Sequence, residues 1–199
     1  MQYFGCIYFY IDLIKGKHLI LEQYESFQKM SYRNRCQVLG PGKVLDLSVP
    51  LIGGRDQKSL ISSVRIDNGQ PWQVQQWRTL ESCYNRSAFF IHYKDELQTL
   101  LFTSFELLWE LNLATIKWVL KKLKSDVTIS FTQSFEKKMD VDCIDYRSCF
   151  IPANRLSQVL VPYQQVYNQP FQTNLSILDL LFNEGPAART YLENHPNKL

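Results

Sequence analysis

The sequence predicts an α/β fold made of a single domain, in which a small mixed sheet has helices packed on it. Three observations lead to this expectation. Short strand-like apolar runs fill the first third of the chain, and after residue 71 the pattern is mainly helical. The chain also has 199 residues, 45% of them hydrophobic, and a chain of this length buries roughly 70% of its extended surface on folding. We therefore expect one domain over residues 1–199, without a linker or an internal repeat.

The first third of the chain is expected to hold one helix followed by strands. Apolar residues at helical spacing predict a helix over residues 3–14, ended by Gly16. The strand candidates that follow are residues 18–22, 33–38, 44–51 and 60–66. The unbroken apolar run Leu19-Ile20-Leu21 suits a strand that is buried on both faces of a sheet. The turn Gly40-Pro41-Gly42 separates the second candidate from the third, so these two are expected to pair as an antiparallel hairpin.

Helical patterns dominate the rest of the chain. They begin at Pro71 and recur in the second half of residues 89–102, in 105–123, in 175–182 and up to about residue 194. Asn112 interrupts the apolar stripe of 105–123, and such a buried amide must find hydrogen-bond partners. Asn174 is expected to cap the helix that follows it. The remaining segments are a short alternating strand at 127–131, a polar loop at 136–142 and a candidate sheet strand at 145–151.

Charge and composition exclude several classes of protein. The net charge is only +3 and the basic residues are scattered, apart from a run between residues 117 and 124, so no nucleic-acid partner is predicted. The longest apolar helix candidate carries Glu106, Glu110 and Lys117, so no membrane span is predicted. The N-terminal residues have neither a basic leader nor a small-residue cleavage site. A cytoplasmic location is therefore predicted.

Neither the cysteines nor the acidic residues predict a metal site. The cysteines stand at positions 6, 36, 83, 143 and 149, and this spacing matches no zinc or redox motif. Asp140, Asp142 and Asp145 alternate in a polar stretch that lacks the central Gly and the terminal Glu of a calcium loop, so a solvated loop is preferred. No nucleophile, base and metal ligand have a spacing that identifies a reaction. Catalytic residues and any cofactor therefore stay unassigned.

The tetrad Tyr32-Arg33-Asn34-Arg35 is the first candidate binding site. If the tetrad is extended, Arg33 and Arg35 point to the same side and form a pair of planar cations. Guanidinium groups bind carboxylate or phosphate through two parallel hydrogen bonds, so a small anionic ligand is predicted. Two alternatives stay open. The arginines could protect a sheet edge, or Glu22 or Glu25 could hold one of them in a salt bridge that orients it.

Further polar residues are candidates for the same site. Arg65 and Asp67 stand at a strand end that leads into a helix, where α/β proteins place ligands, although a surface ion pair and an Asx turn are the preferred explanation. Tyr163 and Ser176 lie near a predicted helix N-terminus, where free backbone N–H groups favour an anion. Together with Asn34, these residues complete the predicted set of substrate contacts.

A series of segments stands out along the chain: Tyr3-Phe4, Tyr8-Phe9, 32–36, 47–50, 64–67, Trp72, Trp77, Pro162-Tyr163-Gln164, Val166, 174–182 and Gly185-Pro186. In this order, these segments resemble the WbqC-like family of bacterial proteins associated with surface-polysaccharide gene clusters. The resemblance implies an enzyme of polysaccharide biosynthesis that transfers an acyl or aminoacyl group to a nucleotide-activated or amino sugar. The alternative is a non-catalytic binding or assembly protein that meets a pathway enzyme through the aromatic residues 3–10.

The chain departs from the family pattern in two places. Members commonly begin with a strand and a Pro-containing turn ahead of the position of Tyr3, whereas this chain opens at Met1-Gln2. We therefore expect either that the first strand is absent or that the true start lies upstream. Many members also have a His before the second Trp, where this chain has Gln76. A mechanism that needs a base at that position is accordingly not expected here.

Overall fold

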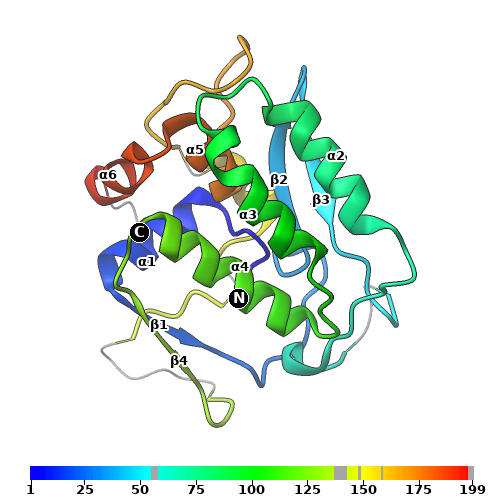
Figure 1. The fold of residues 1–199 in the computed structure, drawn as a ribbon. Coiled ribbons are helices and arrows are strands. Elements are labelled where there is room, and N and C mark those ends of the chain that lie inside the picture. The colour runs from blue at the N-terminus through cyan, green and yellow to red at the C-terminus, as the bar shows by residue number, and fades with distance from the viewer. Residues whose placement is uncertain (55–57, 137–142, 148, 158, 197–199) are drawn as a thin grey trace.

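The computed structural model describes residues 1–54, 58–136, 143–147, 149–157 and 159–196, and within them it shows a mixed α/β domain (Figure 1). The helices are α1 (Ile7–Gly16), α2 (Trp72–Tyr84), α3 (Phe90–Phe102), α4 (Leu108–Lys122), α5 (Ile177–Glu184) and α6 (Ala187–Asn194). Short 3₁₀ turns are η1 (Ile61–Ser63) and η2 (Pro152–Ser157). The strands are β1 (His18–Leu21), β2 (Arg35–Gly40), β3 (Lys43–Ser48) and β4 (Thr128–Phe131).

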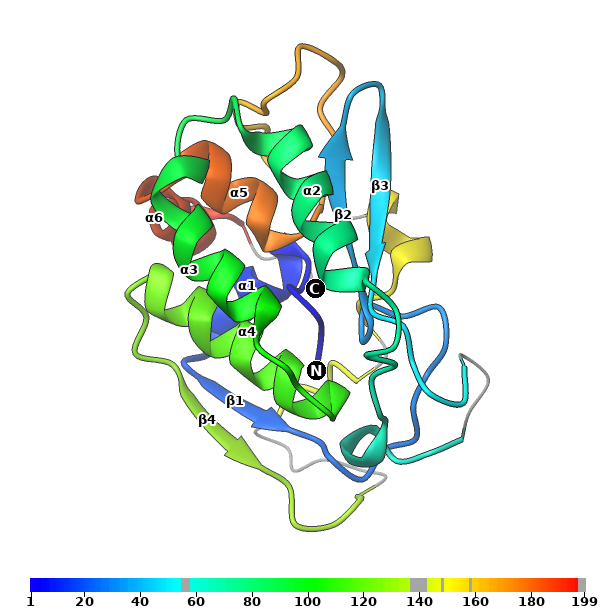
Figure 2. The same cartoon turned by 45° about the vertical axis from the view of Figure 1, so that its right-hand side comes forward.

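The strands form two separate pairs instead of the one sheet that the sequence suggested. The hairpin of β2 and β3 is antiparallel, as predicted, with Arg35 opposite Ser48 and Gly40 opposite Lys43. β1 and β4 are parallel, with Leu21 opposite Phe131. Both views show the hairpin beside α2 and the β1–β4 pair at the far end of the molecule, below α4 (Figures 1 and 2). The helices between the two pairs fill the space where a continuous sheet would run.

Aromatic side chains and α1 form the centre of the core. Every α1 residue from Ile7 to Ile14 is buried except Asp12, and the helix packs against α5, α6 and β1. On α5, Phe182 stacks edge-on against Tyr84 and Phe90 at centroid distances of 4.9 and 5.0 Å. The aromatic surplus in the composition therefore lies mostly in the core. Residues 3–10, proposed as a partner-binding surface, are buried as well, so that surface does not exist.

Several sequence expectations need correction. Residues 60–66 do not form a strand. They contain η1, and Leu51 and Leu107 each form a β-bridge with only one residue of this segment. β1 is not buried on both faces, since β4 is its one strand neighbour and Ile20 is 43% exposed. The described residues of 145–151 do not join either strand pair. The cap of α5 is Ser176, whose Oγ accepts from the Leu178 N–H, instead of Asn174.

Two smaller differences concern helix boundaries. The first helix begins at Ile7, later than expected, and α3 is helical from Phe90 onward instead of only in its second half. The polar loop predicted at 136–142 falls, beyond Glu136, outside the described residues.

Candidate functional site

A cavity of about 320 Å³ lies between α1, β1, the segment after β1 and the segment 143–147 with Phe150. One face of α1 lines it through residues at helical spacing, namely Phe9, Asp12, Leu13 and Gly16. The charged residues around the cavity are Asp12, Glu22, Glu25, Arg33, Asp145 and Arg147. The volume is within the range of small-molecule sites, and the mixture of apolar walls with a few convergent polar groups is typical of them.

Arg33 enters the cavity from a turn that precedes β2. Its backbone is fixed at both ends, because its N–H donates to Ser31 Oγ and its carbonyl accepts from Asn112 Nδ2 at 2.8 Å. Asn112 is fully buried on α4, so the interruption of that apolar stripe has found the hydrogen bond that it required. A helix from the middle of the sequence thus holds the cavity arginine in place.

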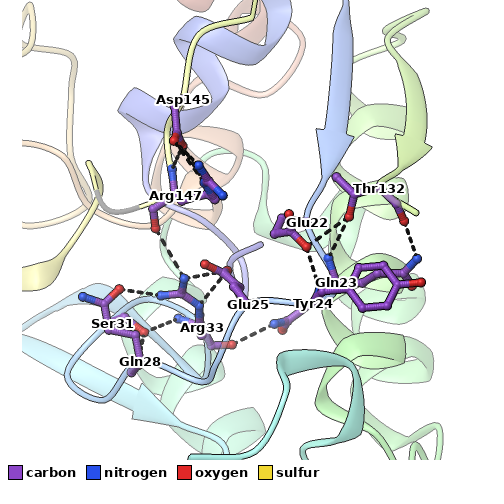
Figure 3. A network of polar contacts seen from close by, with 11 residues as sticks. Glu22, Gln23, Tyr24, Glu25, Gln28, Ser31, Arg33, Thr132, Asp145 and Arg147 are labelled. Carbon is purple, nitrogen blue, oxygen red and sulfur yellow. Dashed lines mark hydrogen bonds and ion pairs between the residues drawn. The ribbon is translucent and has the colours of Figure 1, made fainter. Parts of the chain in front are cut away.

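The guanidinium of Arg33 is already occupied by protein groups. Its Nη2 lies 2.6 Å from Glu25 Oε1 and its Nε donates to the same oxygen at 3.2 Å. The Nη1 donates to Gln28 Oε1 at 2.8 Å, and Nη2 also donates to the Arg147 carbonyl at 3.3 Å (Figure 3). The Arg33 and Glu25 side chains are 6% and 11% exposed. The pair is therefore shielded from solvent. Of the alternatives considered from the sequence, the structure shows the salt bridge between Glu25 and one of the two arginines.

Glu22 is placed by the parallel pairing of β1 with β4. Since Leu21 lies opposite Phe131, the next residues, Glu22 and Thr132, meet at the carboxyl ends of both strands. The Thr132 hydroxyl donates to Glu22 Oε1 at 3.1 Å, and the Tyr24 N–H donates to the same oxygen at 2.6 Å (Figure 3). Glu22 is only 5% exposed. The carboxyl ends of parallel strands are where open α/β sheets present ligand-binding groups.

The segment 143–147 contributes a second ion pair. Arg147 Nη2 lies 2.5 Å from Asp145 Oδ2, and Arg147 Nη1 donates to the Glu136 carbonyl. The hydrogen bond from Arg147 lowers the pKa of Asp145. Asp145 in turn raises the pKa of Arg147, with smaller contributions from the charges of Glu22 and Glu25. Both guanidinium groups of the cavity are consequently neutralised by carboxylates of the protein itself.

Asp12 and Tyr146 both line the cavity and are hydrogen-bonded to each other. Burial raises the pKa of Asp12, and a hydrogen bond with Tyr146 and the charge of Lys15 offset part of this rise. Burial, followed by the charge of Asp12, raises the pKa of Tyr146 to about 12. Met1 also lines the cavity, and burial, followed by the charge of Arg33, lowers the pKa of its amino group to about 6.

The two-arginine clamp expected from the sequence does not form. Arg33 lies in a turn, and the alternation of a strand begins only at Arg35, so the geometric premise fails. Arg35 is not among the residues that line the cavity. Its Nε is buried and has no hydrogen-bond partner among the described residues. The neighbouring amide of Asn34 donates to the Val49 carbonyl and holds β3 to the turn.

The other predicted contacts lie elsewhere in the domain. Arg65 reaches Glu106 at 3.9 Å, with side chains 61% and 80% exposed, on the surface. Asp67 accepts from the Gly69 N–H and from Gln70 Nε2, which is the Asx turn considered as its alternative. Of the seven predicted site residues, Arg33 is the one that reaches this cavity.

Ser176 belongs to the interior, and Tyr163 is a half-buried residue packed against the core. Ser176 is 2% exposed, and its hydroxyl donates to the Phe4 carbonyl. Tyr163 donates to Oδ2 of Asp179, a fully buried carboxylate that also accepts from Tyr84 and Gln165. Burial raises the pKa of Asp179, and these three hydrogen bonds offset part of the rise. This cluster ties α5 to α2 and to the segment before α5.

Among the histidines, His18 lines the cavity and its Nε2 lies 2.8 Å from Ser130 Oγ. Gln76, which stands just before Trp77, accepts from the Tyr3 hydroxyl at 2.7 Å and donates to the Ser48 carbonyl. Within the described ranges, no three His, Cys, Asp or Glu residues are grouped as a metal site would require. The helices of this part of the chain include none with the length and apolar character needed to cross a bilayer.

Sequence reasoning placed Arg33, Glu22 and Glu25 near one another and did not bring the other charged groups to the site. Asp12, Asp145 and Arg147 come from segments that the tertiary fold alone brings together. Glu22 had one local signal, since it directly follows the apolar run of β1, and a carboxylate at such a strand end is a candidate for a site.

The fold and the cavity define a mixed α/β protein with a cavity, lined by several charged residues, at the carboxyl ends of two parallel strands. The model of the WbqC-like protein family matches residues 2–149 and 145–191, so the chain belongs to this family. No curated protein and no solved structure matches the chain.

Proposed function

We propose that this chain is a cytoplasmic protein of bacterial surface-polysaccharide biosynthesis that binds a sugar substrate in the cavity beside Arg33. The observation that carries the proposal is the cavity itself, in which the carboxylates of Glu22 and Asp12 and the Arg33–Glu25 pair meet. Carboxylates and guanidinium groups fixed by neighbouring hydrogen bonds offer acceptors and donors for sugar hydroxyls. In this proposal the reaction is acyl or aminoacyl transfer to a nucleotide-activated or amino sugar.

The anionic part of such a substrate has limited access to Arg33. Of its five N–H groups, two are bonded to Glu25, one to Gln28 and one to the Arg147 carbonyl. One N–H of Nη1 is therefore left for a ligand. A phosphate or carboxylate that forms two parallel hydrogen bonds with the guanidinium would have to displace Gln28 or Glu25. We propose that Arg33 donates a single hydrogen bond to the substrate and that its charge serves mainly to hold Glu25.

The proposal is tested by thermal unfolding with a panel of nucleotide-sugars and free sugars. A ligand that binds only the folded state raises the melting temperature with concentration. The double variant E25Q/R33Q removes both charges together, so neither remains unpaired, and it should abolish the rise. R35Q is the matched control and should keep it, since Arg35 lies outside the cavity. If no sugar raises the melting temperature, or if R35Q abolishes the rise as E25Q/R33Q does, the proposal fails.

The alternative of a non-catalytic binding or assembly protein predicts sugar binding without turnover in the presence of acyl donors. The surface first suggested for its partner, residues 3–10, lies in the core. Deletion of those residues would unfold the protein and would not test partner binding. Turnover with a purified donor and acceptor distinguishes the two alternatives directly.

A further inference from the structure

We infer that the cavity recognises a protonated amine, and that Glu22 is the residue that receives it. The inference deepens the proposed function, on which it rests, because it selects amino sugars from the wider class of sugars. The ligand class is a primary ammonium group carried on a polar, hydroxyl-bearing frame. Three observations point to it: the hydrogen bonds of Glu22, the charge balance of the cavity and the arrangement of its acidic groups.

The hydrogen bonds of Glu22 are distributed unevenly between its two oxygens. Oε1 accepts both from Tyr24 N and from Thr132 Oγ1. Oε2 is buried and has no hydrogen-bond partner among the described residues. Glu22 is 5% exposed and lines the cavity, so the residue that carries this unused acceptor belongs to the site. A buried carboxylate oxygen without a donor is costly, and a ligand donor on that side would relieve the cost.

The charge balance of the cavity favours a cation. Its four carboxylate residues, Asp12, Glu22, Glu25 and Asp145, face two guanidinium groups, the Met1 amino group, whose pKa is lowered to about 6, and His18. Glu25 and Asp145 are each paired with one of these guanidiniums. Among the described residues, neither Glu22 nor Asp12 forms an ion pair, although the charge of Lys15 acts on Asp12, and Oδ2 of Asp12 is also buried there without a hydrogen-bond partner. The site therefore has negative charge that no ion pair balances, and an anionic ligand would be repelled there.

The geometry favours an ammonium group over a metal ion. Hard cations such as Ca²⁺ take six to eight oxygen ligands, and Mg²⁺ needs near-octahedral coordination. No cluster of three potential metal ligands occurs in the described part of the chain, the cavity lining included. An ammonium group needs only a few acceptors for its three N–H groups. Glu22 Oε2 meets this need as a charged acceptor, and Asp12 and the cavity hydroxyls are further acceptors.

The experiment compares three sugars of one shape by calorimetric titration: glucosamine, N-acetylglucosamine and glucose. Acetylation removes the charge of the amine, and glucose replaces the amine by a hydroxyl. The wild-type protein should bind glucosamine roughly 10- to 100-fold more tightly than either neutral sugar, as expected for a charge-assisted hydrogen bond. E22Q keeps the side-chain shape and an oxygen for the bonds of Oε1, but it carries no charge and should lose this preference. E106Q, which removes an exposed carboxylate outside the cavity, is the control and should keep it.

The possible outcomes separate the inference from the proposed function. Equal binding of all three sugars by the wild type overturns the inference and leaves the sugar-binding role standing. A preference for glucosamine that E22Q retains also overturns the inference, because the charge of Glu22 is then not the cause. A parallel titration with ethanolamine, an amine without a sugar ring, tests whether the sugar frame contributes to binding. If ethanolamine binds as tightly as glucosamine and depends on Glu22, the amine site stands and the sugar-specific function fails. No binding of any of the four probes at millimolar concentration overturns the inference, and the nucleotide-sugar panel then decides whether the proposed function stands.

Discussion

Asn112 of α4 donates from Nδ2 to the carbonyl oxygen of Arg33 at 2.8 Å, and this bond joins the core of the domain to the turn that carries the cavity arginine. Asn112 is fully buried, and its Oδ1 has no partner among the described residues. The turn is also held by the Tyr3 N–H on the Tyr32 carbonyl and by two hydrogen bonds between Asn34 and Val49. One amide far away in the sequence thus contributes to the position of the site.

We predict that N112L lowers the free energy of unfolding by roughly 1–3 kcal/mol, because it leaves the Arg33 carbonyl buried without a donor. Urea unfolding followed by circular dichroism measures the change. N112D should be worse than N112L, since a carboxylate has no N–H for that carbonyl and adds a buried charge. T99S, at an exposed threonine of α3, should stay close to wild type. Equal stability of N112L and wild type would show that the bond contributes nothing to the fold.

The buried ion pair of Glu25 and Arg33 should show strong energetic coupling. Removing one charge leaves the other uncompensated in a shielded site, so we predict that E25Q and R33Q each cost roughly 3–5 kcal/mol. The double variant should cost clearly less than the sum of the two, by about 1 kcal/mol or more. A double-mutant cycle by chemical denaturation gives the coupling directly.

The exposed pair of Arg65 and Glu106 is the matched control for that cycle. Its atoms lie 3.9 Å apart and both side chains are mostly in solvent. R65Q and E106Q should therefore be additive within about 0.5 kcal/mol. Additive behaviour of the Glu25 and Arg33 variants as well would contradict the close, shielded contact that the site needs.

The parts of the fold that followed from local sequence were predicted well. The hairpin depends on the Gly40-Pro41-Gly42 turn between two strand-like runs, and both signals lie within a few residues of each other. The pairing of β1 with β4 could not be predicted in the same way. More than a hundred residues separate the partners, and the sequences of two such short strands do not indicate which other strand each will pair with. The sequence therefore predicted strands of the right kind and joined them in a single sheet.

The site shows the same division more sharply. The salt-bridge alternative of Arg33 with Glu25 was visible in the sequence, because only eight positions separate the two residues along the chain. Arg35 was predicted to line the same site as Arg33 on the assumption that residues 32–35 are extended. Because residues 32–34 form a turn instead, Arg35 lies outside the cavity. Asp145 and Arg147 reach the cavity through a contact with the Arg33 side chain that only the tertiary fold creates.

The buried carboxylate of Asp179 should make stability depend on pH in an unusual direction. Its pKa is raised by burial above the ordinary value of 3.8. The folded protein therefore binds this proton more strongly than the unfolded chain does. The corresponding stability is fully present below pH 3.8 and is lost as the pH rises through the folded pKa. Other carboxylates act in the opposite direction, so the contribution has to be isolated by a variant.

We predict that D179N is less stable than wild type by roughly 1–3 kcal/mol, because Tyr84, Tyr163 and Gln165 all direct donors at the two carboxylate oxygens and an amide offers only one acceptor. The difference between wild type and D179N should shrink as the pH is raised from about 4 to 7, since only wild type carries the ionisation cost. Urea unfolding of both proteins across this range measures the effect. A difference that stays constant or grows with pH would contradict the raised pKa.

Gly185 ends α5 in a conformation that other residues adopt only with strain. Its φ is +53°, and a Cβ at this position would lie 2.4 Å from the ring of Phe89. G185A should therefore be destabilised both by the left-handed backbone and by a clash that moves Phe89, for a combined loss of about 2 kcal/mol or more. Gly16, the last residue of α1, is the matched control, because a Cβ there meets no atom within 4 Å. G16A restricts the unfolded chain and should leave stability unchanged or raise it by up to about 1 kcal/mol. Thermal unfolding of the two variants side by side decides the point: equal losses would mean that helix-end flexibility is responsible, whereas a loss confined to G185A identifies the contact with Phe89 and the positive φ as the cause.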